Sequence, residues 1–213
     1  MRRIMCISLV LILGALMTMG CSNKKLIAQK DQHITSLQDE ISSLESQLAT
    51  QRQMNDDLSA MLSDYQAKEK VWLEEKDGMT QITLDGSATF PTASAKLSDE
   101  GKDIINLIWK VLDDYPDRAI LIEGHTDNRP LNPSMYETYR SNWELSSARA
   151  HEVLHYIRKQ FGTPPERIMA VGCGEFQPIA DNTTEMGMEK NRRVVITIGA
   201  KLEKVKIVSP PES

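Results

Sequence analysis

Two histidines stand at the spacing of zinc ligands in the second half of the chain. His151-Glu152-Val153-Leu154-His155 spells HExxH, which on a helix offers two imidazole ligands and a carboxylate as general base. At about 100° per residue, however, both histidines flank the apolar stripe of that helix and point toward solvent. Arg158 stands where the extended zinc-protease motif has glycine. A zinc hydrolase is therefore a secondary hypothesis, and we expect no metal ligands and no cofactor.

A carboxylate and a guanidinium are expected to converge near one end of a predicted sheet. Asp127 follows a short apolar strand, and Arg149 lies in the first turns of a predicted helix. A planar guanidinium binds a carboxylate through two parallel hydrogen bonds, which lysine cannot reproduce. The two residues can hold the opposite charges of a zwitterionic ligand, or they can bridge each other as a structural ion pair. Spacing alone leaves both interpretations open.

The elements that must position these residues follow from hydrophobic periodicity. Four segments have the pattern of strands, at residues 81–84, 119–122, 167–171 and 193–198. Ser98 is a predicted N-cap for a helix that ends by Pro116, and a second helix is predicted from about Glu144 to Phe161. The order β-α-β-α-β-β predicts an α+β fold in which the helices lie on one face of a mixed sheet.

A long helical repeat precedes this region. Between Ser22 and Asp77 the chain contains neither glycine nor proline, and Asp77-Gly78 is predicted to end the helix. With Ile27 as heptad position a, most a and d positions through Trp72 are apolar. This repeat predicts a coiled-coil helix over residues 27–72, and hence a homo-oligomer. A lone amphipathic helix that packs on the domain is the alternative.

The first residues have the pattern of an export signal. Two arginines at positions 2 and 3 precede an uncharged run that reaches Gly20-Cys21. A small residue before cysteine resembles a bacterial lipoprotein signal and predicts lipidation of Cys21, although Thr18 and Met19 depart from the usual pattern. A retained membrane anchor is the alternative. In both cases the remainder of the chain lies outside the cytoplasm.

Composition and charge exclude some classes of partner. The chain has 213 residues and a formal charge of -5, so it lacks the basic field that nucleic-acid binding requires. If Cys6 leaves with the signal and Cys21 is lipidated, Cys173 remains as the one thiol and is predicted to be a small core residue. We expect four regions: a signal at 1–20, an anchor and stalk at 21–77, a globular domain at 78–200 and a tail at 201–213.

Three sequence blocks resemble a known family. They are Ile122–Asn128, Asn142–Ala150 and Gly172–Glu175 with the later Asn191–Val194. Together, in this order and spacing, they resemble the OmpA-like C-terminal domain family, which includes OmpA, Pal and MotB. Phe90, Ala95 and Leu97 are similar to the opening of that domain. The resemblance covers residues 79–200.

The resemblance implies a ligand and residue roles. The family binds the peptide stem of peptidoglycan and holds its meso-diaminopimelate residue. By this resemblance Asp127 pairs with the ligand's ammonium and Arg149 holds its carboxylate. Asn142 and Thr126 line the same pocket, and the pair Arg192 and Arg193 braces the fold near it, with Arg193 as the supporting residue. Because a lysine-type wall lacks the side-chain carboxylate, a preference for diaminopimelate walls follows.

The resemblance also implies a cellular role. A lipid-anchored chain of this kind would tether the outer membrane to the cell wall from its periplasmic face, without catalysis. Ser22 after the lipidated cysteine favours the outer membrane over the inner one. Residues 128–141 form a longer stretch than in OmpA and resemble the MotB-like branch, which raises a stator in the inner membrane as an alternative. A proton-carrying stator requires a carboxylate in its membrane segment, and residues 4–20 contain none.

Overall fold

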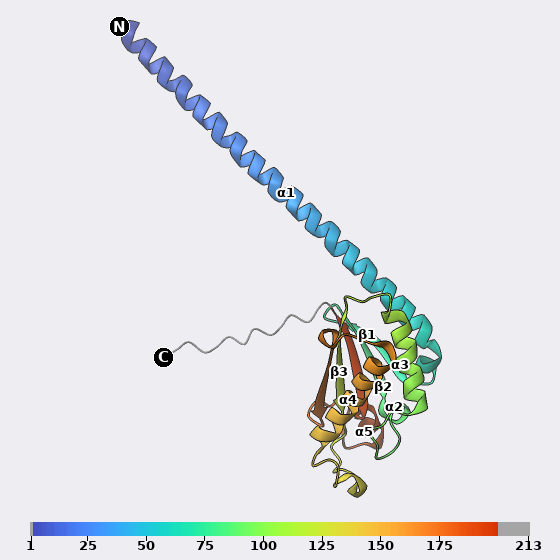
Figure 1. Cartoon of the computed structure of the whole chain (residues 1–213). Coiled ribbons are helices and arrows are strands. Elements are labelled where there is room, and N and C mark those ends of the chain that lie inside the picture. Colours follow the sequence, from blue (N-terminus) through green and yellow to red (C-terminus); the bar gives the residue numbers. More distant parts are fainter. Residues whose placement is uncertain (1, 200–213) are drawn as a thin grey trace, which may run out of the picture. The chain divides into compact units, whose positions relative to one another are not determined.

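The structure is a computed structural model that describes the backbone of residues 2–199 (Figure 1). Side chains are described for residue 24 and for residues 26–199. The predicted signal at 1–20, the lipidation site Cys21 and the tail at 201–213 lie outside the residues whose side chains are described. The chain divides into two compact units, residues 1–52 and 53–213, which are described separately.

Helix α1 (Arg2–Ala67) runs through the first unit. The large apolar side chains of this unit are all exposed in the described range: Leu26, Ile27, Ile34, Leu37, Ile41, Leu44 and Leu48. The apolar heptad positions from residue 27 to residue 48 therefore form an exposed stripe among the described residues. No helix in the described part of the chain has an apolar stretch long enough to cross a membrane.

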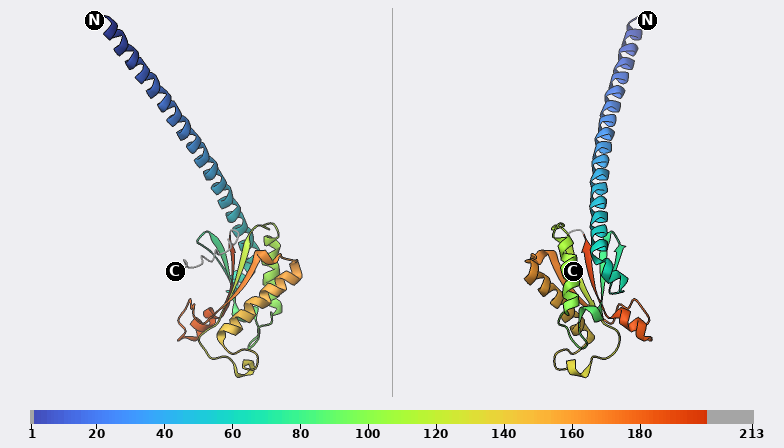
Figure 2. Two further views of the ribbon diagram at one scale, coloured as in Figure 1. Left: turned by 60° about the vertical axis from the view of Figure 1, so that its left-hand side comes forward. Right: turned by 90° about the vertical axis from the view of Figure 1, so that its right-hand side faces the viewer.

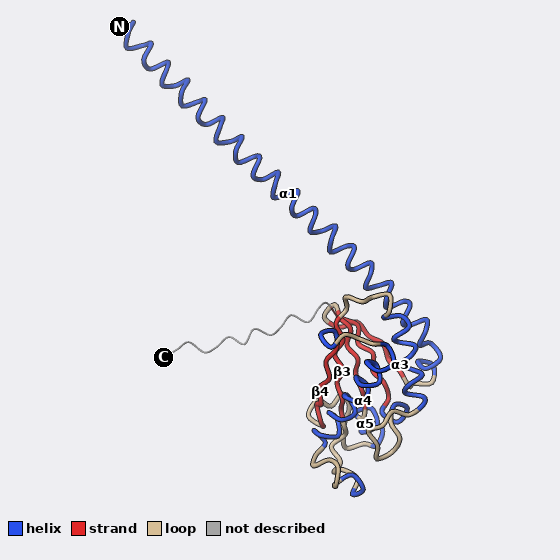
Figure 3. The backbone as a smooth tube through the Cα atoms, in the orientation of Figure 1, coloured by secondary structure: helices blue, strands red, loops and turns tan. Residues whose placement is uncertain are grey.

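The second unit is built on a five-stranded mixed sheet (Figure 3). Its strands are β1 (Val71–Lys76), β2 (Met79–Asp85), β3 (Ala119–His125), β4 (Ile168–Gly174) and β5 (Arg193–Gly199), in the order β1-β2-β5-β3-β4. β3 and β4 pair in parallel, and all other neighbours are antiparallel. The α+β mixed sheet predicted from the sequence is confirmed, with one strand more than expected.

The main helices cover one face of this sheet. Figure 2 shows α3 (Asp99–Leu112) and α4 (Asn142–Phe161) on the same side of the strands. The core lies between these helices and the sheet. Both layers contribute fully buried side chains to it, among them Ile82, Ile104, Ile120, Ile157 and Ile196. The predicted cap is confirmed, since the Ser98 hydroxyl accepts a hydrogen bond from the amide of Gly101. Short helices α2 (Gly86–Thr89) and α5 (Glu185–Asn191) were not predicted.

The end of the long helix differs from the prediction. α1 ends at Ala67, and Trp72 lies in β1, so the expectation of one helix through residue 72 is wrong. Asp77 and Gly78 both have positive φ and join β1 to β2 as a tight hairpin turn. Asp-Gly between two apolar segments is a strong hairpin signal, because both turn positions require left-handed backbone.

The last turns of α1 belong to the globular unit. Met54, Leu58 and Leu62 are completely buried in the same core as α3 and the sheet. Asn55, predicted at a coiled-coil position, accepts a hydrogen bond from the Thr80 hydroxyl of β2 instead. An apolar stripe at heptad spacing therefore serves the domain core here, which is the alternative the sequence had left open.

Two glycines let α4 lie directly on the parallel strands. A Cβ atom on Gly124 of β3 would stand 2.1 Å from the carbonyl oxygen of Ser146, and one on Gly172 of β4 would stand 2.5 Å from the amide of Ser147. Both positions therefore require glycine for close backbone approach. The contact places the beginning of α4 at the carboxyl ends of β3 and β4.

Candidate functional site

A cavity of about 630 Å³ opens beside the end of β3. Its wall comes from the loop after α2, the segment that follows β3, the first half of α4 and the residue before β5. The structure brings all four predicted ligand residues to this cavity, namely Thr126, Asp127, Asn142 and Arg149. Arg193, predicted as a supporting residue, does not line it.

Asp127 is buried and forms the anionic side of the cavity. Its Oδ2 receives Nη1 of Arg192 at 2.6 Å and Nη2 of Arg129 at 3.1 Å. Its Oδ1 accepts the backbone amide of Arg129 at 3.1 Å. The carboxylate is thus held in place from two sides by arginines, each of which carries further donors.

Arg149 forms the cationic side. Its Nε donates to the carbonyl oxygen of Ser94 at 3.1 Å, and its guanidinium lies over the Phe90 ring, 5.2 Å from the ring centroid. Burial lowers the pKa of Arg149 to about 10, while the negative charge of Asp127 opposes this shift. The group remains protonated at neutral pH.

Asp127 and Arg149 share the cavity without forming an ion pair. Among the described residues, no carboxylate oxygen lies within 4.0 Å of the Arg149 nitrogens. The structural bridge left open by the sequence is therefore absent in this part of the chain. Arg149 is a partly buried cation with a carbonyl and an aromatic ring as neighbours, and it lines the cavity.

Asn142 and Thr126 complete the polar lining. The Asn142 amide donates to the carbonyl oxygen of Arg129 at 2.9 Å and to Oε2 of Glu175 at 2.6 Å, so it ties the start of α4 to the segments after β3 and β4. The Thr126 hydroxyl is buried and has no hydrogen-bond partner among the described residues. A buried hydroxyl without a partner is uncommon, and a ligand at this wall would supply one.

Arg193 anchors a segment behind the cavity. Its guanidinium is buried and donates to the carbonyl oxygens of Asn191 and Gln177, at 3.2 and 3.0 Å. These bonds fix the segment between β4 and β5, which contains α5. The position immediately before it, Arg192, is the one that reaches the cavity.

A buried polar cluster lies beside Arg193. Ligand atoms of Glu123, His125 and Cys173 lie within 4.8 Å of one another. Burial lowers the pKa of His125 to about 4, and the nearby positive charge of Arg193 acts in the same direction. That fixed guanidinium also disfavours a metal ion among these donors. Cys173 is buried, as predicted, and lies in this cluster.

Arg129 is a site residue that the sequence reasoning did not assign, and Arg192 was expected only to brace the fold near the site. Arg192 lies 65 positions from Asp127, so only the pairing of β3 with β5 brings the two together. Arg129 follows Asp127 by two positions, a spacing at which an aspartate often accepts the backbone amide. This turn pattern was the available signal for Arg129.

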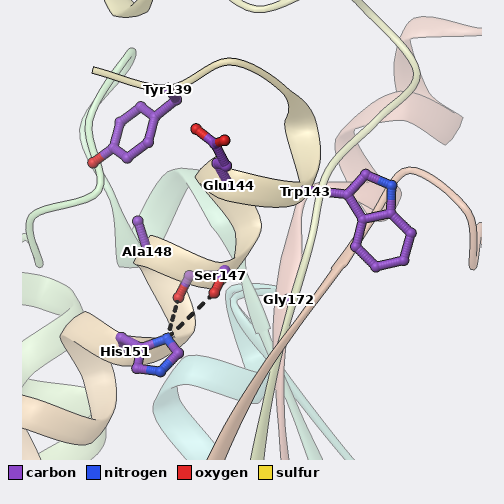
Figure 4. Close-up of a pocket in the computed structure, with 7 residues that line it drawn as sticks. All are labelled: Tyr139, Trp143, Glu144, Ser147, Ala148, His151 and Gly172. Atoms are coloured by element: carbon purple, nitrogen blue, oxygen red, sulfur yellow. Dashed lines mark hydrogen bonds between the residues drawn. The ribbon is translucent and has the colours of Figure 1, made fainter.

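A second hollow of about 520 Å³ lies along the outer side of α4 (Figure 4). It includes His151, whose Nδ1 donates to the carbonyl oxygen of Ser147 at 2.8 Å on the preceding turn. His151 and His155 are exposed, as predicted from the helix periodicity. In the described part of the chain, neither histidine belongs to a group of three potential metal ligands. Trp143, at the edge of this hollow, is exposed and stacks on Phe176 with ring centroids 5.1 Å apart.

Comparison with known proteins assigns the fold. Residues 89–192 match the model of the OmpA family. The cell wall anchor of the T6SS from Pseudomonas aeruginosa is 34% identical, with a TM-score of 0.60, over 67% of this chain and 96% of that one. Residues 89–192 therefore form an OmpA family domain. The matched range contains the four ligand residues that the sequence predicted, namely Thr126, Asp127, Asn142 and Arg149.

Two curated proteins are also similar to this chain. Uncharacterized protein YtxE of Bacillus subtilis is 34% identical over 148 residues, which is 70% of this chain and 60% of that protein. Motility protein B of the same organism is 35% identical over 117 residues, which is 55% of this chain and 44% of that protein. The chain thus spans about half the length of these two relatives.

Proposed function

We propose that this protein binds peptidoglycan without covalent chemistry, by holding the zwitterionic end of a meso-diaminopimelate residue between Asp127 and Arg149. The observation that carries the proposal is a cavity whose wall holds a buried carboxylate and a separate guanidinium that has no ion-pair partner among the described residues. Membership of the OmpA family supports the same ligand, as does similarity to a solved cell wall anchor.

Arg149 supplies the carboxylate site. A charged group that is taken out of water and left unpaired is destabilising by at least about 1–3 kcal/mol, so the cavity wall gains when an anion arrives. Because Nε is occupied by Ser94, the terminal nitrogens are the groups left for a ligand carboxylate. Contact with the Phe90 ring holds the guanidinium plane in one orientation.

Asp127 supplies the ammonium site. Its Oδ1 accepts a single hydrogen bond from a backbone amide, which leaves capacity for a ligand donor. Arg192 fixes the carboxylate from the side of β5, so the acceptor is oriented before the ligand arrives. The Thr126 hydroxyl, which lacks a partner among the described residues, lies on the same wall.

This geometry predicts selectivity between wall types. The side chain of diaminopimelate ends in both an ammonium and a carboxylate, whereas lysine ends in an ammonium alone. A lysine-type stem would satisfy Asp127 and leave Arg149 buried without an anion. We therefore expect diaminopimelate walls to be retained in preference to lysine-type walls.

The deciding experiment is co-sedimentation of the full chain with purified sacculi. Asp127→Asn keeps the side-chain shape, Arg149→Gln leaves a shorter polar side chain, and both remove the charge. Arg140→Gln is a matched control, since Arg140 is exposed on the loop of residues 128–141 and does not line the cavity. Loss of retention in the first two variants with the control unchanged supports the site. Retention equal to wild type in both charge variants rejects it.

The proposal extends to the role of the whole chain as a tether. Signal removal at residues 1–20 with lipidation of Cys21 would fix one end to a membrane, while the globular unit from about residue 53 binds the wall. The exposed apolar stripe of residues 26–48 favours self-association of the stalk as a coiled coil. No catalytic step is part of this function.

We place the anchor in the outer membrane, with its domain in the periplasm, and keep the inner membrane as the alternative. The similarity to Motility protein B motivates that alternative. Membrane fractionation of the wild-type chain and of Cys21→Ser distinguishes the two locations. If the wild-type chain sediments with the outer membrane and Cys21→Ser is released from it, the lipid tether is supported. If the Cys21→Ser chain stays in the inner membrane, a retained anchor is supported.

A further inference from the structure

The cavity carries more positive charge than a simple zwitterion needs. Its charged lining residues are Asp127, Arg129, Arg149 and Arg192, three cations and one anion. Glu185 lies behind them, 3.2 Å from Arg129 and 3.7 Å from Arg192, and its side chain is 68% exposed. Even with Glu185 counted in full, one positive charge remains after an ammonium and a carboxylate have bound.

The three arginines differ in depth. Arg149 is clamped by Ser94 and Phe90, and Arg192 is 28% exposed and bound to Asp127 at 2.6 Å. Arg129 lies on the loop of residues 128–141, and its side chain is 49% exposed. It is thus the cation at the mouth of the cavity, where the rest of a bound stem would leave toward solvent.

Arg129 also occupies part of the predicted ammonium site. Its Nε and Nη2 both reach Oδ2 of Asp127 at 3.1 Å. A ligand ammonium that binds Asp127 competes with these two donors and can release them. A guanidinium released beside the ligand presents two parallel N–H groups, the geometry that suits a carboxylate.

We propose that Arg129 binds a second carboxylate of the same ligand, so that the cavity recognises one ammonium and two carboxylates. This inference rests on the proposed function and names the ligand class more narrowly. In a wall stem the second carboxylate has two sources. It is either the free carboxylate of the neighbouring isoglutamate or the other carboxylate of diaminopimelate itself, which is free when the stem ends there.

The test is a titration of the full chain with soluble stem peptides. One stem ends at diaminopimelate with both sources free. A second has the isoglutamate carboxylate amidated, and a third continues with D-alanine amide, which blocks the other source without adding a new carboxylate. Each is titrated into wild type, Arg129→Gln and the loop control Arg140→Gln. Blocking the carboxylate that Arg129 reads should weaken wild type about fivefold, the scale of one partly exposed ion pair.

The Arg129→Gln variant gives the decisive comparison. It should bind the unblocked stem about fivefold more weakly than wild type and show no further loss with the blocked stem, because the two changes remove one interaction. The identity of the sensitive stem names the source. Equal losses from blocking in wild type and Arg129→Gln would overturn the inference, and so would tighter binding of every stem by Arg129→Gln, which would make Arg129 a competitor only. Neither result touches the proposed function, which fails only if Asp127→Asn and Arg149→Gln bind the unblocked stem like wild type.

Discussion

Replacing Arg149 by lysine separates charge from geometry at the proposed carboxylate site. Lysine keeps the positive charge but cannot donate to Ser94 and to a ligand carboxylate through a rigid fork. In the structure the guanidinium uses Nε for the Ser94 carbonyl at 3.1 Å, which leaves its terminal nitrogens for the ligand. An ammonium on a flexible stem would offer a single point of contact.

The size of the effect follows from the contacts that lysine loses. One charge-assisted hydrogen bond contributes about 1.5–3 kcal/mol to binding. Loss of the planar contact with the Phe90 ring adds on the order of 0.5 kcal/mol. Together these predict binding that is weaker by roughly 30-fold to a few hundred-fold for Arg149→Lys.

The assay is titration of the full chain with a soluble diaminopimelate stem, followed by co-sedimentation with sacculi. Arg140→Lys is the matched control, because this arginine is exposed and outside the cavity. Thermal unfolding of each variant checks the fold, where loss of the charge-assisted Ser94 bond should lower the free energy of unfolding by up to about 1.5–3 kcal/mol. If Arg149→Lys remains folded and binds within about threefold of wild type, the idea of a two-pronged carboxylate site is refuted.

Three further predictions concern the helix and the buried cluster. Leu58→Ala should lower the free energy of unfolding of the domain by about 2–5 kcal/mol in a denaturant titration, since Leu58 is fully buried, whereas Leu44→Ala on the exposed stripe should leave it nearly unchanged. Leu44→Asp should instead reduce self-association in sedimentation velocity, and a wild-type chain that sediments as a monomer would contradict the coiled coil. The folded-state pKa of His125 is about 4 and its ordinary value is 6.5, so the stability tied to its neutral form is complete above pH 6.5 and is lost as the pH falls toward 4. At about 1.4 kcal/mol per pH unit the loss amounts to about 3 kcal/mol; His125→Gln should flatten this dependence, and parallel curves for both chains would count against it.

The sequence by itself determined most of the elements and the identity of the polar residues at the site. Strand and helix periodicity, the Ser98 cap and the three family blocks are local features, so they can be recognised from the amino-acid sequence alone. The heptad pattern, which is equally local, misplaced the end of α1. A heptad stripe and the buried face of a domain helix have almost the same period, and only burial in the folded chain separates Leu58 from Leu44.

Only the tertiary structure decided which charges meet. The pairing of β5 with β3 brings Arg192 to Asp127 across 65 positions, and the close seat of α4 on Gly124 and Gly172 sets where Arg149 lies. Whether an acid and an arginine bridge or stay apart depends on a few ångströms between distant segments. Sheet register and backbone contact fix that distance, and residue spacing along the chain carries no record of it.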